Sequence, residues 1–150
     1  MKIGIGNDHS ALELKAEIVE LLKENGHEVV DYGTNSPESC DYPVYGEKVG
    51  RAVASGEVER GILICGTGIG VSIAANKVPG AYAALVSDVY SAQRARLSND
   101  ANIMCMGAFT TGNKERELFV DAFLTNEFVP GCASQPKVDA FHKYDEEHSK

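Results

Sequence analysis

The sequence predicts an α/β fold in which a five-stranded parallel sheet carries helices on both faces. Short apolar runs of strand length alternate five times with segments whose apolar residues recur at helical spacing, which favours parallel strands joined by helical crossovers. The chain has 150 residues, of which 43% are hydrophobic and 24% charged, as in an ordinary water-soluble domain with its own core. We therefore expect one domain spanning residues 1–150.

The N-terminal segment is predicted to form a strand and a helix. Residues 2–6 are a short apolar strand, and a polar turn at 7–10 leads into a helix over 11–25. Gly26 ends this helix in the manner of a C-terminal glycine cap. The apolar positions at helical spacing are Leu14, Ile18, Leu21 and Leu22.

Residues 27–31 are predicted to form the second strand. The loop after them extends to Pro43 and is rich in Gly, Asn, Ser and Pro, which are turn-forming residues. A helix over 44–54, ending near Gly56, then leads to the third strand at 61–64.

The chain is organised around the stretch from Ile62 to Ser72. Three aliphatic residues lead into Cys65 and glycines follow at alternate positions, which predicts a buried strand, a tight turn and a helix over 70–77. Such a turn directs backbone N–H groups and a helix N-terminus at one point, where they stabilise an anion or a cysteine thiolate. We therefore predict an active site for a phosphorylated or otherwise anionic small molecule. The glycines are Gly66, Gly68 and Gly70.

The second half of the chain continues the alternation of strands and helices. Its tail, from Pro130, is predicted to be irregular, with a further helix after Pro136. The other predicted elements are a strand at 81–86, a helix capped by Asp88 that extends to Leu97, a strand at 102–106 and a helix at 113–125.

Polar turns follow three of the predicted strands. They are Asp8-His9, Cys65–Thr67 and Ser87-Asp88. Because ligands of parallel sheets bind outside the carboxyl ends of the strands, near the point where the strand order reverses, we expect the site at this edge.

Composition excludes several other classes of function. A net charge of −8 argues against non-specific nucleic-acid binding, and no apolar run approaches the length of a membrane span. The N-terminal residues lack the features of a signal peptide, so we expect a cytoplasmic protein. The cysteines are widely spaced and are predicted to be free thiols instead of disulfides or a zinc site. They are Cys40, Cys65, Cys105 and Cys132.

Other interpretations of the glycine turn and of the candidate residues are available. A dinucleotide-binding GxGxxG fingerprint would need a glycine at Val71, and a P-loop would need Gly-Lys-Ser/Thr after the glycines. Cys65 taken alone would be a buried cysteine at a strand end. Asp8 would be a helix cap, Tyr42 loop packing and Asn99 part of a helix-ending turn.

Five segments, in the right order and spacing, carry a resemblance to a known family. The most specific is the run GILICGTGIGVSIAANK over residues 61–77. The others are Gly6–His9, Asp41–Pro43, Tyr90–Gln93 and Asn99–Asn102. With these segments the chain resembles the ribose-5-phosphate isomerase B family, which includes the subunits of galactose-6-phosphate isomerase.

The resemblance implies a Rossmann-like three-layer sandwich and a homodimer, with further pairing into tetramers left open. It implies active sites at the subunit interface, a tail at residues 130–150 that contacts the partner subunit, and no metal or organic cofactor. The implied reaction is reversible aldose–ketose isomerisation of a sugar phosphate through a cis-enediolate, as in the pentose phosphate pathway.

The resemblance also assigns roles to individual residues. By match, Cys65 is the base that moves a proton between C1 and C2, and Thr67 assists ring opening or proton shuttling. The backbone amides of residues 66–70, which include Gly66, Gly68, Ile69 and Gly70, hold the enediolate oxygen. The residues that bind the sugar hydroxyls or the phosphate are Asp8, His9, Tyr42 and Asn99. The residue chemistry agrees, because proton abstraction beside a carbonyl needs a base and donors for the developing oxyanion.

Ser98 departs from the family. Many members have a histidine there that is assigned to ring opening, and serine cannot exchange protons near neutral pH as imidazole does. Ring opening then falls to Thr67, to Ser98 through a water, or to His9. Alternatively, the substrate is a tetrose phosphate, which needs no ring opening.

The tail departs as well. Family members have two arginines there that clamp the phosphate, and Lys137 is the nearby cation in this chain. A lysine is a point charge and cannot replace a bidentate guanidinium clamp. The phosphate is then held by Lys137, by Arg94 or Arg96, or by another region of the chain.

The leading prediction is therefore isomerisation of ribose 5-phosphate to ribulose 5-phosphate. Galactose 6-phosphate and a tetrose phosphate are alternative substrates. A non-catalytic subunit or sugar-phosphate-binding module is an alternative of another kind, which the changes at Ser98 and in the tail favour. The retained Cys65 argues against it, because a binding module needs no base there.

Overall fold

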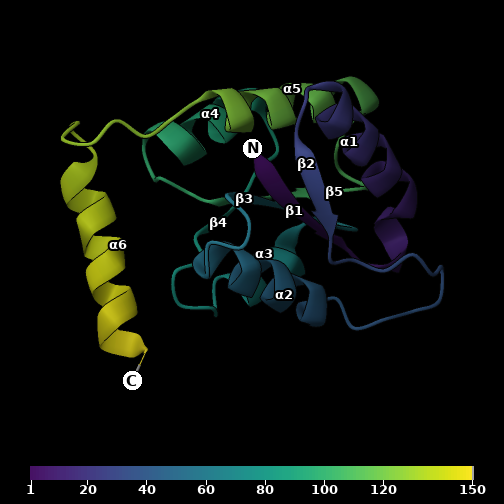
Figure 1. Cartoon of the computed structure of the whole chain (residues 1–150), viewed down its shortest axis with the longest axis horizontal. Coiled ribbons are helices and arrows are strands. Elements are labelled where there is room, and N and C mark those ends of the chain that lie inside the picture. The colour runs from purple at the N-terminus through teal and green to yellow at the C-terminus, as the bar shows by residue number, and fades with distance from the viewer. Residues whose placement is uncertain (150) are drawn as a thin grey trace.

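Five parallel strands form the middle layer of the computed structural model, which describes residues 1–149 (Figure 1). Residue 150, the last of the expected tail, lies outside the described residues. The spatial order of the strands is β2-β1-β3-β5-β4. The strands are β1 (Lys2–Asn7), β2 (Glu28–Asp31), β3 (Arg60–Cys65), β4 (Ala83–Leu85) and β5 (Ile103–Gly107). The helices are the 3-10 helix η1 (His9–Ala11), α1 (Leu12–Glu24), α2 (Pro43–Ala54), α3 (Ile69–Ala75), α4 (Val89–Leu97), α5 (Asn113–Thr125) and α6 (Gln135–His148).

Helices cover both faces of this sheet, which confirms the predicted Rossmann-like three-layer fold. Figure 1 shows α1, α4 and α5 over one face and α2 and α3 over the other. The alternating side chains of β3 supply both cores. Ile62 and Ile64 belong to the core beneath α1, α4 and α5, whereas Leu63 and Cys65 belong to the core beneath α2 and α3. A central strand buried on both faces needs the unbroken apolar run seen in the sequence.

The caps of the first helical segment and of α4 agree with the prediction. The segment begins with η1, where the Asp8 carboxylate accepts a hydrogen bond from the Ser10 N–H at 3.0 Å, so Asp8 does act as a cap. Gly26 follows α1 with a φ of 80°, the left-handed conformation of a glycine cap. Asp88 caps α4 by accepting from the Ser91 N–H at 2.7 Å.

The fourth strand is shorter than predicted. Residues 81–86 were expected to be extended, but β4 spans only Ala83–Leu85. It is an edge strand, and the Asn76 side chain binds both backbone groups of Ala83 that face away from the sheet. Asn76 Nδ2 donates to the Ala83 carbonyl at 2.9 Å, and the Ala83 N–H donates to Asn76 Oδ1 at 2.8 Å. This pairing protects the edge from other strands.

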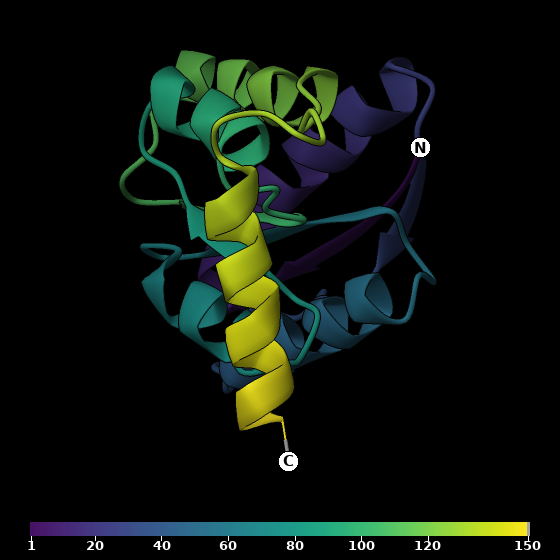
Figure 2. The same ribbon diagram turned by 90° about the vertical axis from the view of Figure 1, so that its left-hand side faces the viewer.

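The tail is irregular only as far as residue 134, because α6 follows. The predicted helix is present and begins one residue before Pro136, which is tolerated in a first helical turn. α6 stands beside the β4 edge of the sheet (Figures 1 and 2). Asp145 Oδ2 attaches it by accepting from the Gly80 N–H at 2.6 Å and the Tyr82 hydroxyl at 2.8 Å. Burial and the bond to Asp145 raise the pKa of Tyr82.

Three further observations concern the cysteines, membrane-spanning helices and metal sites. All four cysteines are free thiols in the described part of the chain, as predicted. None of the helices within residues 1–149 has the length and apolar character needed to cross a membrane. Over the same residues, no group of three His, Cys, Asp or Glu side chains is arranged to hold a metal ion.

Candidate active site

The candidate site lies where the strand order reverses, at the carboxyl ends of β1 and β3. These neighbouring strands end at Asn7 and Cys65, and their connections lead to opposite halves of the sheet. The Asp8 N–H donates to the Ile64 carbonyl at 3.3 Å, so the turn after β1 lies against the end of β3. Two of the three polar turns expected at this edge, Asp8-His9 and Cys65–Thr67, are therefore adjacent in the structure.

The glycine turn wraps around the sulfur of Cys65. The Gly68 N–H donates a hydrogen bond to Cys65 Sγ at 3.1 Å, and the cysteine is only 5% exposed. Gly68 has a φ of 77°, and a Cβ there would lie 2.8 Å from the carbonyl carbon of Met106, so only glycine fits. An N–H directed at the sulfur stabilises the thiolate form, which is the form that takes up a proton.

The end of β5 fixes the position of the turn. The Ala108 N–H donates to the Cys65 carbonyl at 2.8 Å, and the Phe109 N–H donates to the Gly66 carbonyl at 3.0 Å. Thr67 Oγ1 accepts from the Ile69 N–H at 3.3 Å, which directs the Thr67 side chain along the start of α3. The backbone donors of the turn are thus held in place before any ligand arrives, as oxyanion stabilisation requires.

A second thiol lies in the same core as Cys65. Cys105 is fully buried, and this burial, together with the charge of Cys65, raises the pKa of its thiol. Cys105 therefore stays protonated and remains part of the core. Cys65, at the end of its strand, is the one of the two that meets the edge of the sheet.

Tyr42 reaches the site from the long loop before α2. A Cβ on Gly70 would lie 2.2 Å from the Tyr42 ring, so the ring lies directly against the first turn of α3. The Tyr42 side chain is 42% exposed, which leaves it able to contact a ligand. The glycine at position 70 is what admits the ring.

His9 and Asp8 occupy the turn after β1. The Cys40 N–H donates to His9 Nδ1 at 3.3 Å, so this nitrogen is the acceptor and the ring hydrogen lies on Nε2. Asp8 is buried, and its Oδ1 accepts from both the N–H and the hydroxyl of Ser10. These bonds fix the orientation of His9 and of the carboxylate at the edge of the sheet.

Sequence reasoning missed Lys15, which tethers the loop that carries Tyr42. Lys15 is buried, and its Nζ donates to Asp31 Oδ2 at 3.0 Å and to the Thr34 carbonyl and Asn35 Oδ1 at 2.6 Å. The available signal was its helical position, because Lys15 continues the buried stripe of α1. A lysine at an apolar position of that stripe indicates a buried ion pair.

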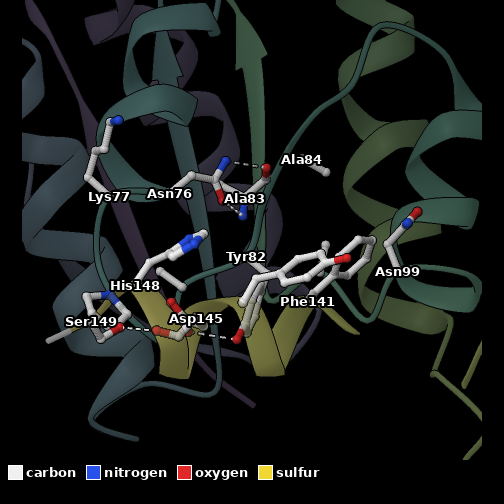
Figure 3. Close-up of a pocket in the computed structure, with 14 residues that line it drawn as sticks. Asn76, Lys77, Tyr82, Ala83, Ala84, Asn99, Phe141, Asp145, His148 and Ser149 are labelled. Atoms are coloured by element: carbon white, nitrogen blue, oxygen red, sulfur yellow. Dashed lines mark hydrogen bonds between the residues drawn. The ribbon is translucent and has the colours of Figure 1, made fainter. Parts of the chain in front are cut away.

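The structure does not bring every expected site residue together. Ser98 and Asn99 follow α4, which runs back from the carboxyl edge, so they lie at the amino edge of the sheet, opposite Cys65. Ser98 Oγ accepts from Arg94 Nε at 2.7 Å. Asn99 lines a cavity of about 680 Å³ between α6 and the β4 edge, and Figure 3 shows it on the opposite side of that cavity from Asn76.

The cations suggested for the phosphate are also remote from Cys65 within one chain. Arg96 is buried at the amino edge, where it donates to the Ala101 carbonyl at 2.6 Å and pairs with Asp100 and Glu127. Arg94 is the hydrogen-bond donor to Ser98 at that same edge. Lys137 is exposed in the first turn of α6.

Glu127 bridges Arg96 and Arg60, which are both buried. Burial opposes ionisation of the Glu127 carboxyl, but the charge of Arg60 and the hydrogen bonds from both arginines outweigh it and lower the pKa of Glu127. Burial, followed by the charge of Arg96, lowers the pKa of Arg60. This network therefore supports the amino edge of the sheet instead of forming part of the site at Cys65.

Comparison with known proteins leads to the same family that the sequence resembles. Residues 3–141 match the family model described as Ribose/Galactose Isomerase. Ribose-5-phosphate isomerase B of Escherichia coli (strain K12) is 48% identical over 139 residues, which are 93% of this chain and 93% of that protein.

Solved structures extend the similarity to the fold. That of Clostridium thermocellum ribose-5-phosphate isomerase B matches with a TM-score of 0.95 and 47% identity, covering 99% of each chain. That of Mycoplasma genitalium ribose-5-phosphate isomerase B with bound ribulose-5-phosphate matches with a TM-score of 0.92 and 39% identity, covering 97% of each chain. The similarity therefore includes the whole sheet and the glycine turn.

Proposed function

This chain belongs to the ribose/galactose isomerase family, and on this premise we propose that it interconverts ribose 5-phosphate and ribulose 5-phosphate. The observation that carries the proposal is the hydrogen bond from the Gly68 N–H to Cys65 Sγ at the switch point of the sheet. It joins a base to a set of backbone donors in one rigid turn, which is what an aldose–ketose isomerase needs. No metal or organic cofactor has a part in this proposal.

Cys65 is the base in the proposed reaction. In the open-chain aldose its thiolate removes the proton on C2, and the electron pair of that C–H bond forms the C1=C2 double bond while the C1 carbonyl becomes an oxyanion. Backbone amides of residues 66–70 stabilise this cis-enediolate. The thiol then returns its proton to C1, and the proton of the C2 hydroxyl passes to the C1 oxygen, so that C2 becomes the ketone, C1 carries a hydroxyl and the thiolate is regenerated. Atoms and electrons balance without an external oxidant or reductant.

We propose that two copies of the chain complete each site. Asn99 and Cys65 cannot meet within one chain because they lie at opposite edges of the sheet. Exposed apolar side chains next to the glycine turn support a second copy there: Ile69 and Ile73 lie on α3, and Leu85 contacts the position of Gly68. In the homodimer, the tail at residues 130–149 contacts the partner and brings Lys137 toward its site.

The remaining roles follow from where the side chains lie. Tyr42, Asp8 and His9 are at the same edge as Cys65 and bind the sugar hydroxyls and phosphate. Thr67 is beside the reacting end in the same chain, and it is the group available there for ring opening. Ser98 contributes to ring opening only from the partner subunit, and its Oγ is already an acceptor for Arg94.

A tetrose phosphate is the second candidate substrate, because Ser98 favours it. Serine is not a proton exchanger near neutral pH, and a tetrose 4-phosphate cannot close an ordinary furanose ring. A substrate that exists only in the open-chain form needs no ring-opening group. With such a substrate, serine in place of histidine at position 98 would not lower the activity.

The test is an NMR assay of the purified protein against ribose 5-phosphate, galactose 6-phosphate and a tetrose 4-phosphate. Ribose 5-phosphate is expected to have the highest kcat/KM. If the kcat/KM for a tetrose 4-phosphate is at least tenfold higher than that for ribose 5-phosphate, the tetrose phosphate is the substrate instead. Absence of turnover with all three would contradict an isomerase and favour a binding module.

A further inference from the structure

We propose that Arg116 is the cation that binds the phosphate group of the substrate, in a cavity that it shares with His9. The inference rests on the proposed function, because it assigns the opposite end of the same sugar phosphate. It replaces Lys137, Arg94 and Arg96 as the main phosphate ligand with a residue of the same chain as Cys65.

The cavity lies directly beside the glycine turn. It has a volume of about 410 Å³, and its lining includes His9, Ser10, Phe109 and Arg116. Gly66 forms the boundary with the turn, because a Cβ there would lie 3.0 Å from the Phe109 ring and 3.7 Å from Ser10 Oγ. The cavity thus begins one residue beyond the reacting sulfur.

Arg116 reaches this cavity from the first turn of α5. The helix follows β5 and therefore begins at the carboxyl edge, the same edge as Cys65. Arg116 Nη1 donates to Glu17 Oε2 at 2.7 Å, and the side chain is 13% exposed. Its position is thus fixed by packing and by one ion pair before any ligand binds.

One donor of Arg116 is unsatisfied. Its Nε is buried and has no hydrogen-bond partner anywhere in residues 1–149. A buried N–H without a partner is costly, and a guanidinium offers phosphate oxygens a planar set of donors. Arg116 lines the cavity, so a phosphate bound there would meet its guanidinium and carry the opposite charge.

His9 supplies the second donor. Because Nδ1 accepts from the Cys40 N–H, the ring hydrogen lies on Nε2 and is available to a phosphate oxygen. Phe109 adds an exposed ring, 77% accessible in the single chain, that walls the cavity beside Gly66. Glu13 also lines the cavity, and its carboxylate opposes the phosphate. Glu13→Gln is therefore expected to lower KM.

The experiment measures KM and kcat for ribose 5-phosphate, and the thermal stabilisation produced by inorganic phosphate, in Arg116→Met. Methionine keeps the apolar stem and removes the charge. The variant is expected to raise KM roughly tenfold or more, as for a lost hydrogen bond between charged groups, with kcat changed much less. Stabilisation by inorganic phosphate should be lost in parallel.

Two control variants separate binding from structure. Lys114→Met removes an exposed cation two residues away on α5 and should leave KM unchanged. Glu17→Gln removes the ion pair but keeps the guanidinium, so KM should stay the same or fall. A purely structural Arg116 would instead make Glu17→Gln and Arg116→Met behave alike, and this result would overturn the inference.

The outcomes distinguish this inference from the proposed function. If the wild type turns over ribose 5-phosphate and Arg116→Met matches its KM and its phosphate stabilisation, the inference fails and the function stands. If a Lys137→Met variant alone raises KM, the phosphate ligand is the partner's tail and the inference also fails. If no sugar phosphate is turned over while inorganic phosphate still binds through Arg116, the function fails and the phosphate subsite stands.

Discussion

Cys65 and Asn99 lie at opposite edges of the same sheet: Cys65 ends β3 at the carboxyl edge, and Asn99 follows α4 at the amino edge. No side-chain rotation can bring the two residues together within one chain. If both act on one substrate molecule, each site takes Cys65 from one subunit and Asn99 from the other. A two-fold dimer provides this arrangement twice.

Subunit mixing tests this arrangement. Cys65→Ala and Asn99→Ala homodimers are each expected to be nearly inactive. After exchange of subunits, half of the dimers are mixed, and each mixed dimer has one site in which both residues are native. Activity should then recover to about a quarter of the wild-type value, as two-fold symmetry requires. Absence of recovery, with mixed dimers demonstrated by mass spectrometry, would mean that Asn99 does not belong to the partner's site.

Gly70→Ala should displace Tyr42 without unfolding the chain. The new Cβ would lie 2.2 Å from the ring, and the ring is exposed enough to move away. We expect kcat/KM to fall about tenfold, as for one lost polar contact of about 1.4 kcal/mol, with little change in Tm. If displacement of Tyr42 is the cause, Gly70→Ala combined with Tyr42→Ala will be no worse than Tyr42→Ala alone. Additive losses would point to a separate role for the glycine.

Lys15→Met should loosen the loop that carries Tyr42. The substitution leaves Asp31 and the Thr34 carbonyl without their buried donor, so unfolding free energy should fall by about 1–3 kcal/mol. KM should rise because Tyr42 is less well positioned. Chemical denaturation and steady-state kinetics measure the two effects. Lys23→Met, at an exposed position of the same helix, is the control and should change stability by less than about 0.5 kcal/mol.

Stability should decrease at acid pH in a way that depends on Glu127. The pKa of Glu127 is lower in the folded protein than in the unfolded chain, so its contribution is present above the unfolded value and is lost as the pH falls through the folded value. Glu127→Gln should therefore be less stable than the wild type at pH 7, and the difference should shrink below about pH 4.3, the ordinary value for glutamate. Melting curves between neutral and acid pH measure it. A difference that is constant with pH would show that the carboxylate charge is not what holds Arg60 and Arg96.

Much of the fold could be predicted because its signals are local. The apolar run into Cys65 marks a strand buried on both faces, and Asp88 and Gly26 mark helix ends through their own backbone chemistry. The start of β4 could not be located in this way. The segment is apolar from Ala81, but β4 begins at Ala83, whose backbone groups bind the side chain of Asn76, seven residues earlier.

The site could be predicted only in part. The glycine turn is a continuous motif, whereas Lys15 and Arg116 are ordinary-looking residues of amphipathic helices. Their burial depends on contacts with Asp31 and Glu17, which are distant in the sequence. The order of motifs along the chain likewise does not show whether a motif lies at the carboxyl edge or the amino edge of the sheet. The separation of Asn99 from the glycine turn is therefore visible only in the topology.

Deuterium incorporation tests the central role of Cys65 most directly. Ribose 5-phosphate is incubated in D₂O with the wild type or with Cys65→Ala, and NMR follows conversion and exchange of the transferred proton. Cys65→Ala should keep the wild-type circular dichroism spectrum and lose at least about a hundredfold in rate, the lower end of the contribution of a general base. A folded Cys65→Ala variant that isomerises and exchanges at the wild-type rate would contradict the account.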